Sequence, residues 1–453
     1  MSAYTAVCAG AIFPLHERLK GHASVAMRAR LERSQWWPRD AIEADRVARL
    51  RLFLADVGQR VPYYRDLFAQ HGFEPARVQS VSALRRLPLL GKADIRAHTD
   101  RLKADGHGPL QRYNTGGSSG EPLVFFIGKD RVSHDVAAKW RATRWWGVDI
   151  GDPEMVVWGS PIELGAQDTV RRWRDKLLRS QLLPAFEMSD SKLDSFIAAI
   201  RQQRPRMLFG YPSALTHIAR HAEKRGVALH DLGIRVAFVT SERLYDEQRA
   251  TIGRVFGCPV ANGYGGRDAG FMAHECPSGG MHISAEHIII ELIGRDGQPV
   301  ADGQPGEIVT THLATRDFPF IRYRTGDVAV LGTDACVCAC GRGLPLLKEI
   351  QGRTTDFVVA ADGTVMHGLA LIYIVRDLPG VQRFKIIQDS LLSTTVLLVV
   401  APGFDAALLQ TITLGMQRQL GAAVVVKVQV VGDIPAETSG KHRYVVSRVA
   451  LPV

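Results

Sequence analysis

Four short segments of the chain combine glycines with hydroxyl, acidic, aromatic or basic side chains that could act on a nucleotide. The first is Thr115-Gly116-Gly117-Ser118-Ser119-Gly120, which precedes an apolar run. Its glycines allow backbone N–H groups to approach an oxyanion, and its hydroxyls add donors for phosphate oxygens. The Gly-Lys-Ser/Thr ending of a Walker A loop is missing. By itself, the segment is equally compatible with a plain turn.

The other three segments contribute an aromatic ring, two carboxylates and a lysine. In Tyr264-Gly265-Gly266-Arg267-Asp268 the ring can stack on a base, and the carboxylate can hold Mg²⁺ or orient a phosphate. Asp327 follows a predicted tight turn and can accept hydrogen bonds from ribose hydroxyls. Lys441 can offset negative charge that develops on a phosphate or carboxylate. Taken singly, each has an ordinary alternative: a plain loop, a solvent-facing turn or a surface lysine.

A Cys-x5-His pair and a Cys-x-Cys pair supply a possible set of metal ligands, Cys276, His282, Cys338 and Cys340. Three cysteines and one histidine suit a tetrahedral Zn²⁺ with no open position, which predicts a structural site. Cys336 and His274 are alternative ligands. Reduced thiols without a metal remain the competing interpretation.

The composition is that of a globular chain with excess positive charge. Of 453 residues, 46% are hydrophobic and 23% are charged, which excludes disordered and fibrous classes. The net charge of +10 favours a polyanionic partner: nucleic acid, an anionic membrane surface or a phosphorylated substrate. No recognised nucleic-acid module occurs, and no stretch reaches the ~18 apolar residues of a membrane helix. The mildly apolar residues 6–15 are broken by Pro14, so we expect no signal peptide and a cytoplasmic protein.

An alternation of helices and strands must position these segments. Residues 1–105 are expected to be mostly helical. From residue 111 to about 331, short β-branched runs alternate with helical stretches such as 191–203, which predicts a layered α/β domain with a largely parallel sheet. The runs that we expect to be strands include 123–127, 155–158 and 234–239.

The remaining segments predict how the chain is divided. The Gly-rich stretch 294–306 predicts consecutive turns. After Gly352 the pattern changes to long valine-rich runs, so we expect a large N-terminal domain over 1–352 and a small α+β domain over 353–453. A dense basic run, 171–179, has two interpretations: a solvated helix face, or a contact with a membrane surface.

In this order and spacing, the four segments resemble those of the adenylate-forming superfamily, which includes acyl-CoA synthetases, peptide-synthetase adenylation domains and luciferases. Within it, the chain is similar to the phenylacetate-CoA ligase group, which has the same Cys…His…Cys-x-Cys pattern. The similarity is greatest to the capsule-biosynthesis, CapK-like branch of that group. The resemblance runs from about residue 45 to the end. Its other matching motifs are residues 61–65, 87–92, 209–213, 240–242, 352–353 and 439–441.

The resemblance implies which residues bind ATP. The loop 115–120 would hold the β- and γ-phosphates, Ser241 and Glu242 would lie against the adenine, Tyr264 would stack nearby, and Asp327 would bind the ribose hydroxyls. The whole set implied for ATP is Thr115, Gly116, Gly117, Ser118, Ser119, Gly120, Ser241, Glu242, Tyr264, Gly265, Asp327, Arg353 and Lys441.

The resemblance also implies the catalytic groups and the acyl pocket. Lys441 would bridge the acyl carboxylate and the α-phosphate, and Asp268 occupies the place of the usual Mg²⁺-binding Glu. Arg353 would lie at the interdomain hinge, although the usual acid two residues later is Thr355 here, with Asp356 following. The acyl pocket would be bounded by Trp158, Phe209, Tyr211, Asn262 and Gly263.

The sequence therefore predicts an ATP-dependent ligase that joins a carboxylic acid to AMP, releases pyrophosphate and passes the acyl group to an acceptor, with CoA favoured. ATP, Mg²⁺, CoA and a structural Zn²⁺ are the expected cofactors. One alternative acceptor is an amine or hydroxyl on a sugar or metabolite. A different alternative is a non-catalytic, zinc-stapled protein that docks through 171–179 on nucleic acid or an anionic membrane. The acid and the oligomeric state stay open, and a homodimer is compatible with the sequence.

Overall fold

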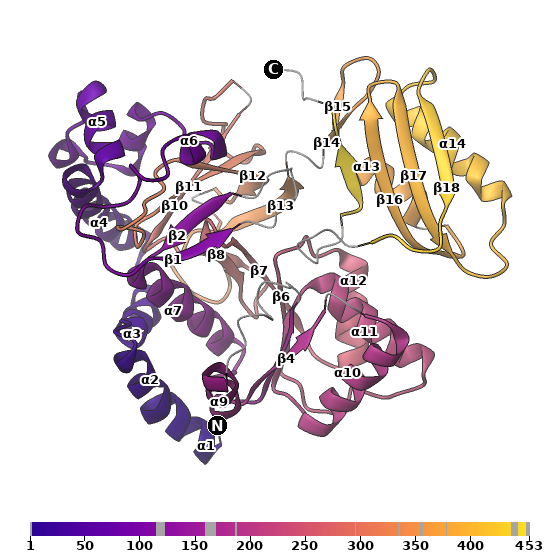
Figure 1. Ribbon diagram of the computed structural model, residues 1–453, viewed down its shortest axis with the longest axis horizontal. Coiled ribbons are helices and arrows are strands. Elements are labelled where there is room, and N and C mark those ends of the chain that lie inside the picture. Colours follow the sequence, from indigo (N-terminus) through magenta and orange to yellow (C-terminus); the bar gives the residue numbers. More distant parts are fainter. Residues whose placement is uncertain are drawn as a thin grey trace.

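In the described part of the chain, three larger sheets and two two-stranded sheets, with their helices, build the molecule, which is shown as a computed structural model in Figure 1. Helices from the N-terminal part of the chain line one side, and the C-terminal sheet forms the opposite end. A central region of strands lies between them. The structure describes residues 2–114, 123–158, 169–185, 188–294, 296–333, 336–353, 357–376, 378–435 and 443–449.

The expected N-terminal helices form, and α4 shows why. Its buried positions Leu50, Phe53, Leu54 and Val57 recur at helical spacing and are fully enclosed, so one face of the helix enters a core. The elements are α1 (Ala3–Val7), the π-turn η1 (Cys8–Ile12), α2 (Phe13–Leu19), α3 (Ser24–Ser34), α4 (Arg39–Arg60), α5 (Pro62–Gln70), the 3₁₀ turns η2 (Pro75–Arg77) and η3 (Val81–Arg86), and α6 (Lys92–Ala97).

Pro14 does not break the first of these helices, contrary to our expectation. The chain is helical without interruption from α1 through η1 to α2. Just before the proline, Phe13 N–H donates to the carbonyl of Cys8, five residues back. Pro14 then occupies the first turn of α2, where its missing N–H is tolerated. The π-turn therefore accommodates the proline within one continuous helix over residues 3–19.

The largest sheet is parallel over most of its width, as predicted. Its strand order is β4-β3-β5-β6-β7-β8-β9. The first five strands in this order, β4 to β7, run parallel to one another. The pairs β7–β8 and β8–β9 are antiparallel. The strands are β3 (Glu154–Trp158), β4 (Ser180–Pro184), β5 (Met207–Gly210), β6 (Val236–Thr240), β7 (Val260–Gly266), β8 (Gly270–Glu275) and β9 (Met281–Ile283).

Helices cover both faces of this sheet. Alternate strand residues divide between the faces: Leu208 and Val239 pack with α10–α12, while Phe209 and Phe238 lie in the core that includes Ala142 of α7. Burial on both faces explains why these strands read as continuous apolar runs. The helices are α7 (Lys129–Trp145), α9 (Thr169–Leu177), α10 (Asp190–Gln203), α11 (Pro212–Lys224) and α12 (Asp246–Phe256).

A second sheet, β10-β11-β12-β13, is antiparallel throughout. The expectation of a parallel arrangement up to residue 331 is therefore wrong for this part of the chain. Asp327 lies within strand β12 rather than after a tight turn. The turn-like residues are accommodated as an irregularity in the strand, where Gly326 has a positive φ of 80° and the pairing with β11 shifts register. The strands are β10 (Ile288–Ile293), β11 (Gly306–His312), β12 (Tyr323–Leu331) and β13 (Leu347–Arg353), and a separate pair is β1 (Gln111–Asn114) with β2 (Val124–Ile127).

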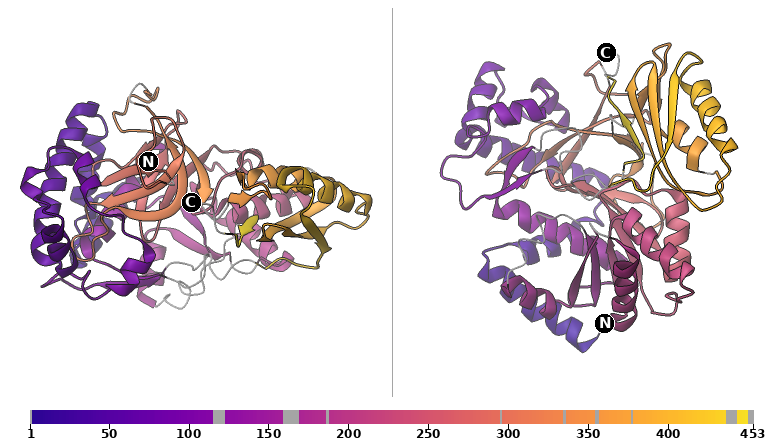
Figure 2. Two further views of the ribbon diagram at one scale, coloured as in Figure 1. Left: turned by 90° about the horizontal axis from the view of Figure 1, so that it is seen from above. Right: turned by 45° about the vertical axis from the view of Figure 1, so that its right-hand side comes forward.

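The C-terminal region is an α+β unit with its own core. Its four-stranded sheet, β18-β17-β16-β19, buries Phe384 and Leu398 against α13 and α14. Figure 2 shows this unit at one end of the molecule. Among its contacts with the rest of the chain, the Arg376 guanidinium lies 3.8 Å from the Glu247 carboxylate of α12. The elements are β14 (Phe357–Val359), β15 (Val365–His367), α13 (Leu369–Arg376), β16 (Val381–Ser390), β17 (Ser393–Val400), α14 (Ala407–Leu420), β18 (Val425–Val430) and β19 (Val445–Ser447).

The predicted α/β class is confirmed by this architecture. Among the described residues, none of the helices has both the length and the apolar character needed to cross a lipid bilayer.

Candidate active site

The carboxyl ends of the parallel strands bring the predicted acyl-pocket residues together. Trp158 is the last residue of β3, and Tyr211 follows β5, its direct neighbour in the sheet. The two rings stack with centroids 4.4 Å apart. Ligands of parallel α/β sheets bind at this edge, because the loops that follow the strands converge there.

Phe209 extends the same aromatic group toward α7. Its ring stacks on Trp158 with a centroid separation of 6.0 Å, and the Lys139 ammonium lies 4.5 Å from the centre of the ring. Asn262 and Gly263 in β7 are the register partners of the last two residues of β6. All five residues predicted for the acyl pocket therefore lie on β3, β5 and β7 or directly after them.

The two residues predicted to face the adenine follow β6. Ser241 has a φ of 71°, in the left-handed region that non-glycine residues rarely adopt. Such backbone strain persists only where the surroundings impose it, and it concentrates at functional sites. Glu242 accepts a hydrogen bond from the Ser213 backbone N–H at 3.2 Å, at the start of α11. The turn after β6 is thereby tied to the loop that carries Tyr211.

Two tyrosines hold the two candidate carboxylates. The hydroxyl of Tyr264 in β7 donates to Asp327 Oδ2 in β12 at 2.8 Å. The hydroxyl of Tyr323 in β12 donates to Asp268 Oδ2, just after β7, at 2.6 Å. Each sheet therefore supplies one tyrosine for a carboxylate carried by the other, and this exchange brings Asp268 and Asp327 to one region where the sheets meet.

Tyr264 is a permanent donor in this arrangement. Burial, together with the neighbouring Asp327 carboxylate, raises the pKa of the Tyr264 phenol well above its usual value of 10. The hydroxyl therefore keeps its proton across the physiological range. Tyr323 was not among the residues predicted from the sequence, because its partner is 55 positions away and no local pattern marks the pair.

A buried arginine supports the segment that carries Asp268. Arg131 of α7, only 2% exposed, donates to the backbone carbonyls of Arg267 at 3.0 Å and Asp268 at 3.4 Å. Its guanidinium also pairs with Asp135 one turn later at 2.9 Å. Sequence analysis missed this residue too, because an arginine within an amphipathic helix predicts a surface position.

Several predicted residues lie partly or wholly outside the described part of the chain. The segment 115–120, Thr355, Asp356 and Lys441 are not among the described residues. Arg353 ends β13, where its backbone is the register partner of Asp327. The Arg243 guanidinium donates to the carbonyl of Gln351 at 2.6 Å, so the segment after Glu242 reaches the strand of the predicted hinge.

The four predicted zinc ligands converge. The ligand atoms of Cys276, His282, Cys338 and Cys340 all lie within 4.8 Å of one another. The Sγ atoms of Cys276 and Cys338 are 3.5 Å apart, and His282 Nε2 is 3.1 Å from Cys340 Sγ. Cys336, one of the alternative ligands, is exposed and lies within hydrogen-bond distance of Thr333 instead.

The surroundings of this cluster suit a tetrahedral metal. His282 Nδ1 lies 3.3 Å from the Leu344 carbonyl, which leaves Nε2 to face the sulfur atoms, as in metal sites where a second hydrogen bond orients the imidazole. Burial lowers the pKa of His282 to about 4, so the ring is neutral and able to bind a metal. A side chain at Gly280 would lie 2.6 Å from Cys338 Sγ, so only glycine fits beside the cluster.

The comparisons with known proteins agree with this geometry. Residues 358–448 match the family model of the CapK C-terminal domain. The chain is 23% identical over 390 residues to the protein CapK of Staphylococcus aureus, covering 85% of each chain. It is 28% identical over 331 residues to a phenylacetate-coenzyme A ligase of Thermus thermophilus, covering 71% of this chain and 72% of that one.

Among solved structures, 2-hydroxyisobutyryl-CoA ligase in its post-adenylation state matches with a TM-score of 0.73 and 20% identity. The match covers 92% of this chain and 91% of that one. The family model, the relatives and the solved structure together support the adenylate-forming ligase superfamily. The predicted superfamily and its CapK and phenylacetate-CoA ligase branch are thereby confirmed.

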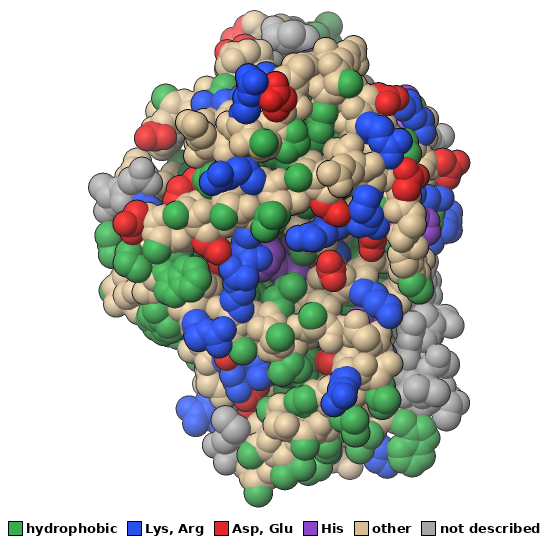
Figure 3. Space-filling model, turned by 90° about the vertical axis from the view of Figure 1, so that its left-hand side faces the viewer, with side chains coloured by type: hydrophobic (Ala, Val, Ile, Leu, Met, Phe, Trp, Pro, Cys, Tyr) green, Lys and Arg blue, Asp and Glu red, His purple; other side chains and the backbone are tan. Residues whose placement is uncertain are grey.

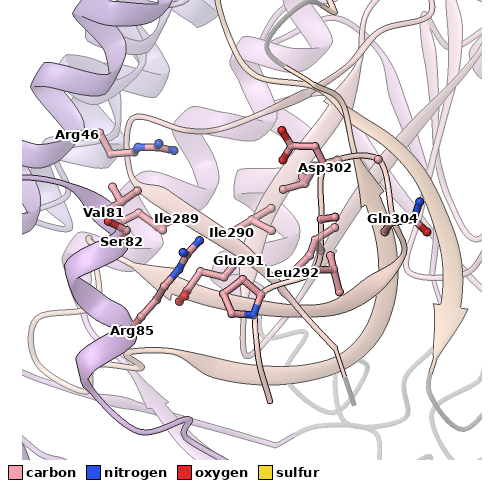
Figure 4. A pocket seen from close by; sticks show the side chains of 15 residues that line it. Arg46, Val81, Ser82, Arg85, Ile289, Ile290, Glu291, Leu292, Asp302 and Gln304 are labelled. Atoms are coloured by element: carbon pink, nitrogen blue, oxygen red, sulfur yellow. The ribbon is translucent and has the colours of Figure 1, made fainter. Parts of the chain in front are cut away.

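A separate cavity of about 170 Å³ in this ligase is lined by residues of α4, η3 and β10 (Figure 4). Figure 4 shows Arg46 and Arg85 on one side of the cavity, Asp302 and Gln304 on the other, and Glu291 between the two sides. Glu291 is already paired with the Arg322 guanidinium at 3.0 and 3.1 Å. The residues of this cavity are distinct from the aromatic group at Trp158, so it is not the predicted acyl pocket.

Proposed function

We propose that the chain catalyses the ATP-dependent adenylation of a carboxylic acid and transfers the acyl group to CoA. The observation that carries the proposal is the reciprocal pairing of Tyr264 with Asp327 and of Tyr323 with Asp268. It sets two carboxylates beside the aromatic strand ends of a parallel sheet. The names of the phenylacetate-CoA ligase relatives support both the acid substrate and the CoA acceptor.

The reaction has two steps. The acid binds beside the stacked rings of Trp158 and Tyr211, and one of its carboxylate oxygens attacks the α-phosphorus of ATP. The bond to the bridging oxygen breaks, which gives an acyl-AMP and pyrophosphate. The CoA thiol, as its thiolate, then attacks the acyl carbon and expels AMP. Asp327 orients the ribose in both steps, because the Tyr264 donor holds its carboxylate in one position.

Two anions meet in the first step, so their repulsion has to be offset. We assign Asp268 to Mg²⁺, since a carboxylate oxygen is the ligand that this ion prefers and the Tyr323 hydroxyl orients the group. When bound there, Mg²⁺ neutralises charge on the phosphate oxygens. Lys441 is assigned the same electrostatic task at the α-phosphate, as the family pattern implies.

A division at Gly352, with domains over 1–352 and 353–453, belongs to the same proposal. Rotation about Arg353 exchanges the adenylation and thioester-forming arrangements, a domain closure of the kind that many enzymes use. The TM-score is 0.73 against the post-adenylation state of 2-hydroxyisobutyryl-CoA ligase and 0.59 against its thioesterification state. This difference supports an adenylation-like placement of the C-terminal unit.

The cluster of Cys276, His282, Cys338 and Cys340 is assigned a structural Zn²⁺. Four protein ligands leave no open coordination position, so the ion would take no part in the reaction. It would tie the β8–β9 hairpin to the segment before β13, where Leu346 pairs with His282. Zinc would thereby stabilise the joint between the two sheets.

The decisive test is a carboxylate-dependent ATP–pyrophosphate exchange screen over aryl, acyl and amino acids. Exchange with at least one acid is expected in the wild type, with loss of about a hundredfold or more in Asp327→Asn and Lys441→Ala. A thioester assay with CoA then tests the second step. Exchange that is absent for every acid, or equal in wild type and variants, would reject the adenylation mechanism.

The CapK relationship favours one second candidate for the acceptor. The CapK match spans 85% of the chain against 71% for the phenylacetate-CoA ligase of Thermus thermophilus, and residues 358–448 carry the CapK C-terminal domain. Since the proposed rotation builds the acceptor site from this unit, an amine or hydroxyl acceptor is the alternative to CoA. Exchange without thioester formation, combined with amide or ester products, would select it.

A further inference from the structure

The helix over residues 3–19 has an unusual outward face. Its buried side includes Thr5, Cys8, Ala9 and Phe13. The opposite side would ordinarily be polar, because it faces water. Here that side presents the large apolar residues Tyr4, Val7, Leu15 and Leu19, with exposures of 40, 56, 60 and 80%. The exposed side of the helix therefore carries four large apolar side chains where polar ones are expected.

The neighbouring helix α9 continues this surface. Trp173 and Leu177 lie one turn apart on α9 and are 62 and 48% exposed. The Tyr4 hydroxyl donates to the Leu177 carbonyl at 2.7 Å, and the Arg179 guanidinium lies over the Tyr4 ring. We call Tyr4, Val7, Leu15, Leu19, Trp173 and Leu177 the apolar patch.

This concentration is not the usual scatter of exposed apolar residues. Among the described residues, 14 large hydrophobic side chains are exposed, and six of them form the apolar patch on these two helices. Figure 3 shows hydrophobic side chains gathered at the lower end of this face, where α1 and α2 lie in Figure 1. Exposed apolar side chains concentrated on two neighbouring helices in this way indicate an interaction site.

The charges around the patch select the partner. In the described parts of 2–20 and 173–179, the basic side chains are Arg18, Lys20, Arg174, Lys176 and Arg179, besides His16. The two acidic residues there are neutralised or enclosed: Asp175 pairs with Arg174, and Glu17 is 3% exposed. An apolar surface with a tryptophan and a basic margin complements anionic lipid headgroups above an acyl layer.

We propose that the apolar patch and its basic margin dock this protein on the surface of an anionic lipid bilayer. The helix over residues 3–19 lies in the plane of the interface, with Leu15 and Leu19 below the headgroups. Lys176 and Arg18 contact the anionic headgroups, which adds electrostatic attraction that salt weakens. This docking would keep an acyl-activating enzyme beside membrane-bound acids or acceptors.

Vesicle co-sedimentation of the full chain tests this surface. Phosphatidylcholine vesicles are compared with vesicles that contain about 30 mol% phosphatidylglycerol, at low and at physiological salt. Binding to the anionic vesicles alone is expected, and Leu15→Ser/Leu19→Ser should weaken it by about tenfold or more. The matched control is Leu52→Ser/Leu414→Ser, which removes two leucines that are 66 and 47% exposed on other helices.

Three results would overturn the proposal. The wild type fails to bind anionic vesicles, or the Leu15→Ser/Leu19→Ser variant binds them as well as the control variant does. The third result is that the wild type binds no vesicles and is a dimer by light scattering, whereas the Leu15→Ser/Leu19→Ser variant is a monomer. A second copy of the chain would then cover the apolar patch. Thermal unfolding of all variants checks that the exposed substitutions leave the fold intact.

Discussion

Replacing Tyr264 by Phe removes one hydroxyl and leaves the ring in place. That hydroxyl donates to the Asp327 carboxylate at 2.8 Å in a largely enclosed position. A hydrogen bond to a charged group is worth about 1.5–3 kcal/mol. At about 1.4 kcal/mol per factor of ten, the expected loss is about 10- to 150-fold in kcat/KM for ATP. Most of it should be a higher KM, because the ribose is bound before and during the reaction.

The measurement is ATP–pyrophosphate exchange as a function of ATP concentration at saturating acid. Tyr4→Phe is the matched control, since it removes a hydroxyl bonded at 2.7 Å to a carbonyl far from the site. 2′-Deoxy- and 3′-deoxy-ATP extend this to a cycle analogous to a double-mutant cycle, with one change in the protein and one in the substrate. When the ribose hydroxyl that binds Asp327 is missing, Tyr264→Phe should reduce kcat/KM much less. A KM within about twofold of wild type, or an undiminished penalty with both 2′-deoxy- and 3′-deoxy-ATP, would refute the reasoning.

Three further predictions concern the groups around the site. Purified without a polyhistidine tag, the protein should contain about one zinc per chain, which Cys338→Ser should lose and the exposed Cys336→Ser should keep; zinc-free wild type would contradict the site. Arg131→Met should lower the free energy of unfolding in urea by about 3–5 kcal/mol, since Asp135 loses its cation, and adding Asp135→Asn should restore part of it; an unchanged urea midpoint would contradict this. Burial lowers the pKa values of His287 and His312 well below 6.5, so as the pH falls the unfolded chain binds protons before the folded chain does. The free energy of unfolding should therefore be at its full value above pH 6.5 and should decrease below it by about 1.4 kcal/mol per pH unit for each histidine. Urea unfolding at pH 7 and pH 5 measures this, and equal free energies would contradict it.

The parallel sheet was predictable because its strands are enclosed on both faces and therefore stand out as short apolar runs, as in residues 155–158 and 234–239. The antiparallel sheet was not. Its strand β12 contains Arg324, Thr325, Gly326 and Asp327, a sequence typical of a turn, and only tertiary pairing with β11 and β13 keeps it extended.

Residue types and motif order were enough to find the candidate carboxylates and the metal ligands. The groups that support them were not visible in the sequence. Arg131 reaches carbonyls 136 and 137 positions away, and Tyr323 reaches a carboxylate 55 positions away. Hydrogen bonds of that separation depend on how the sheets and helices pack, so no local pattern marks the donors.

The reciprocal exchange between the sheets has a consequence for recombination. Tyr264 and Asp268 precede any crossover point placed at residue 280, 295 or 315, and their partners Asp327 and Tyr323 follow it. A chimera joined anywhere between Asp268 and Tyr323 would take each hydroxyl from one parent and its acceptor from the other. Crossover points for swapping acyl specificity among relatives therefore belong before Tyr264 or after Asp327, so that both pairs are inherited as one block.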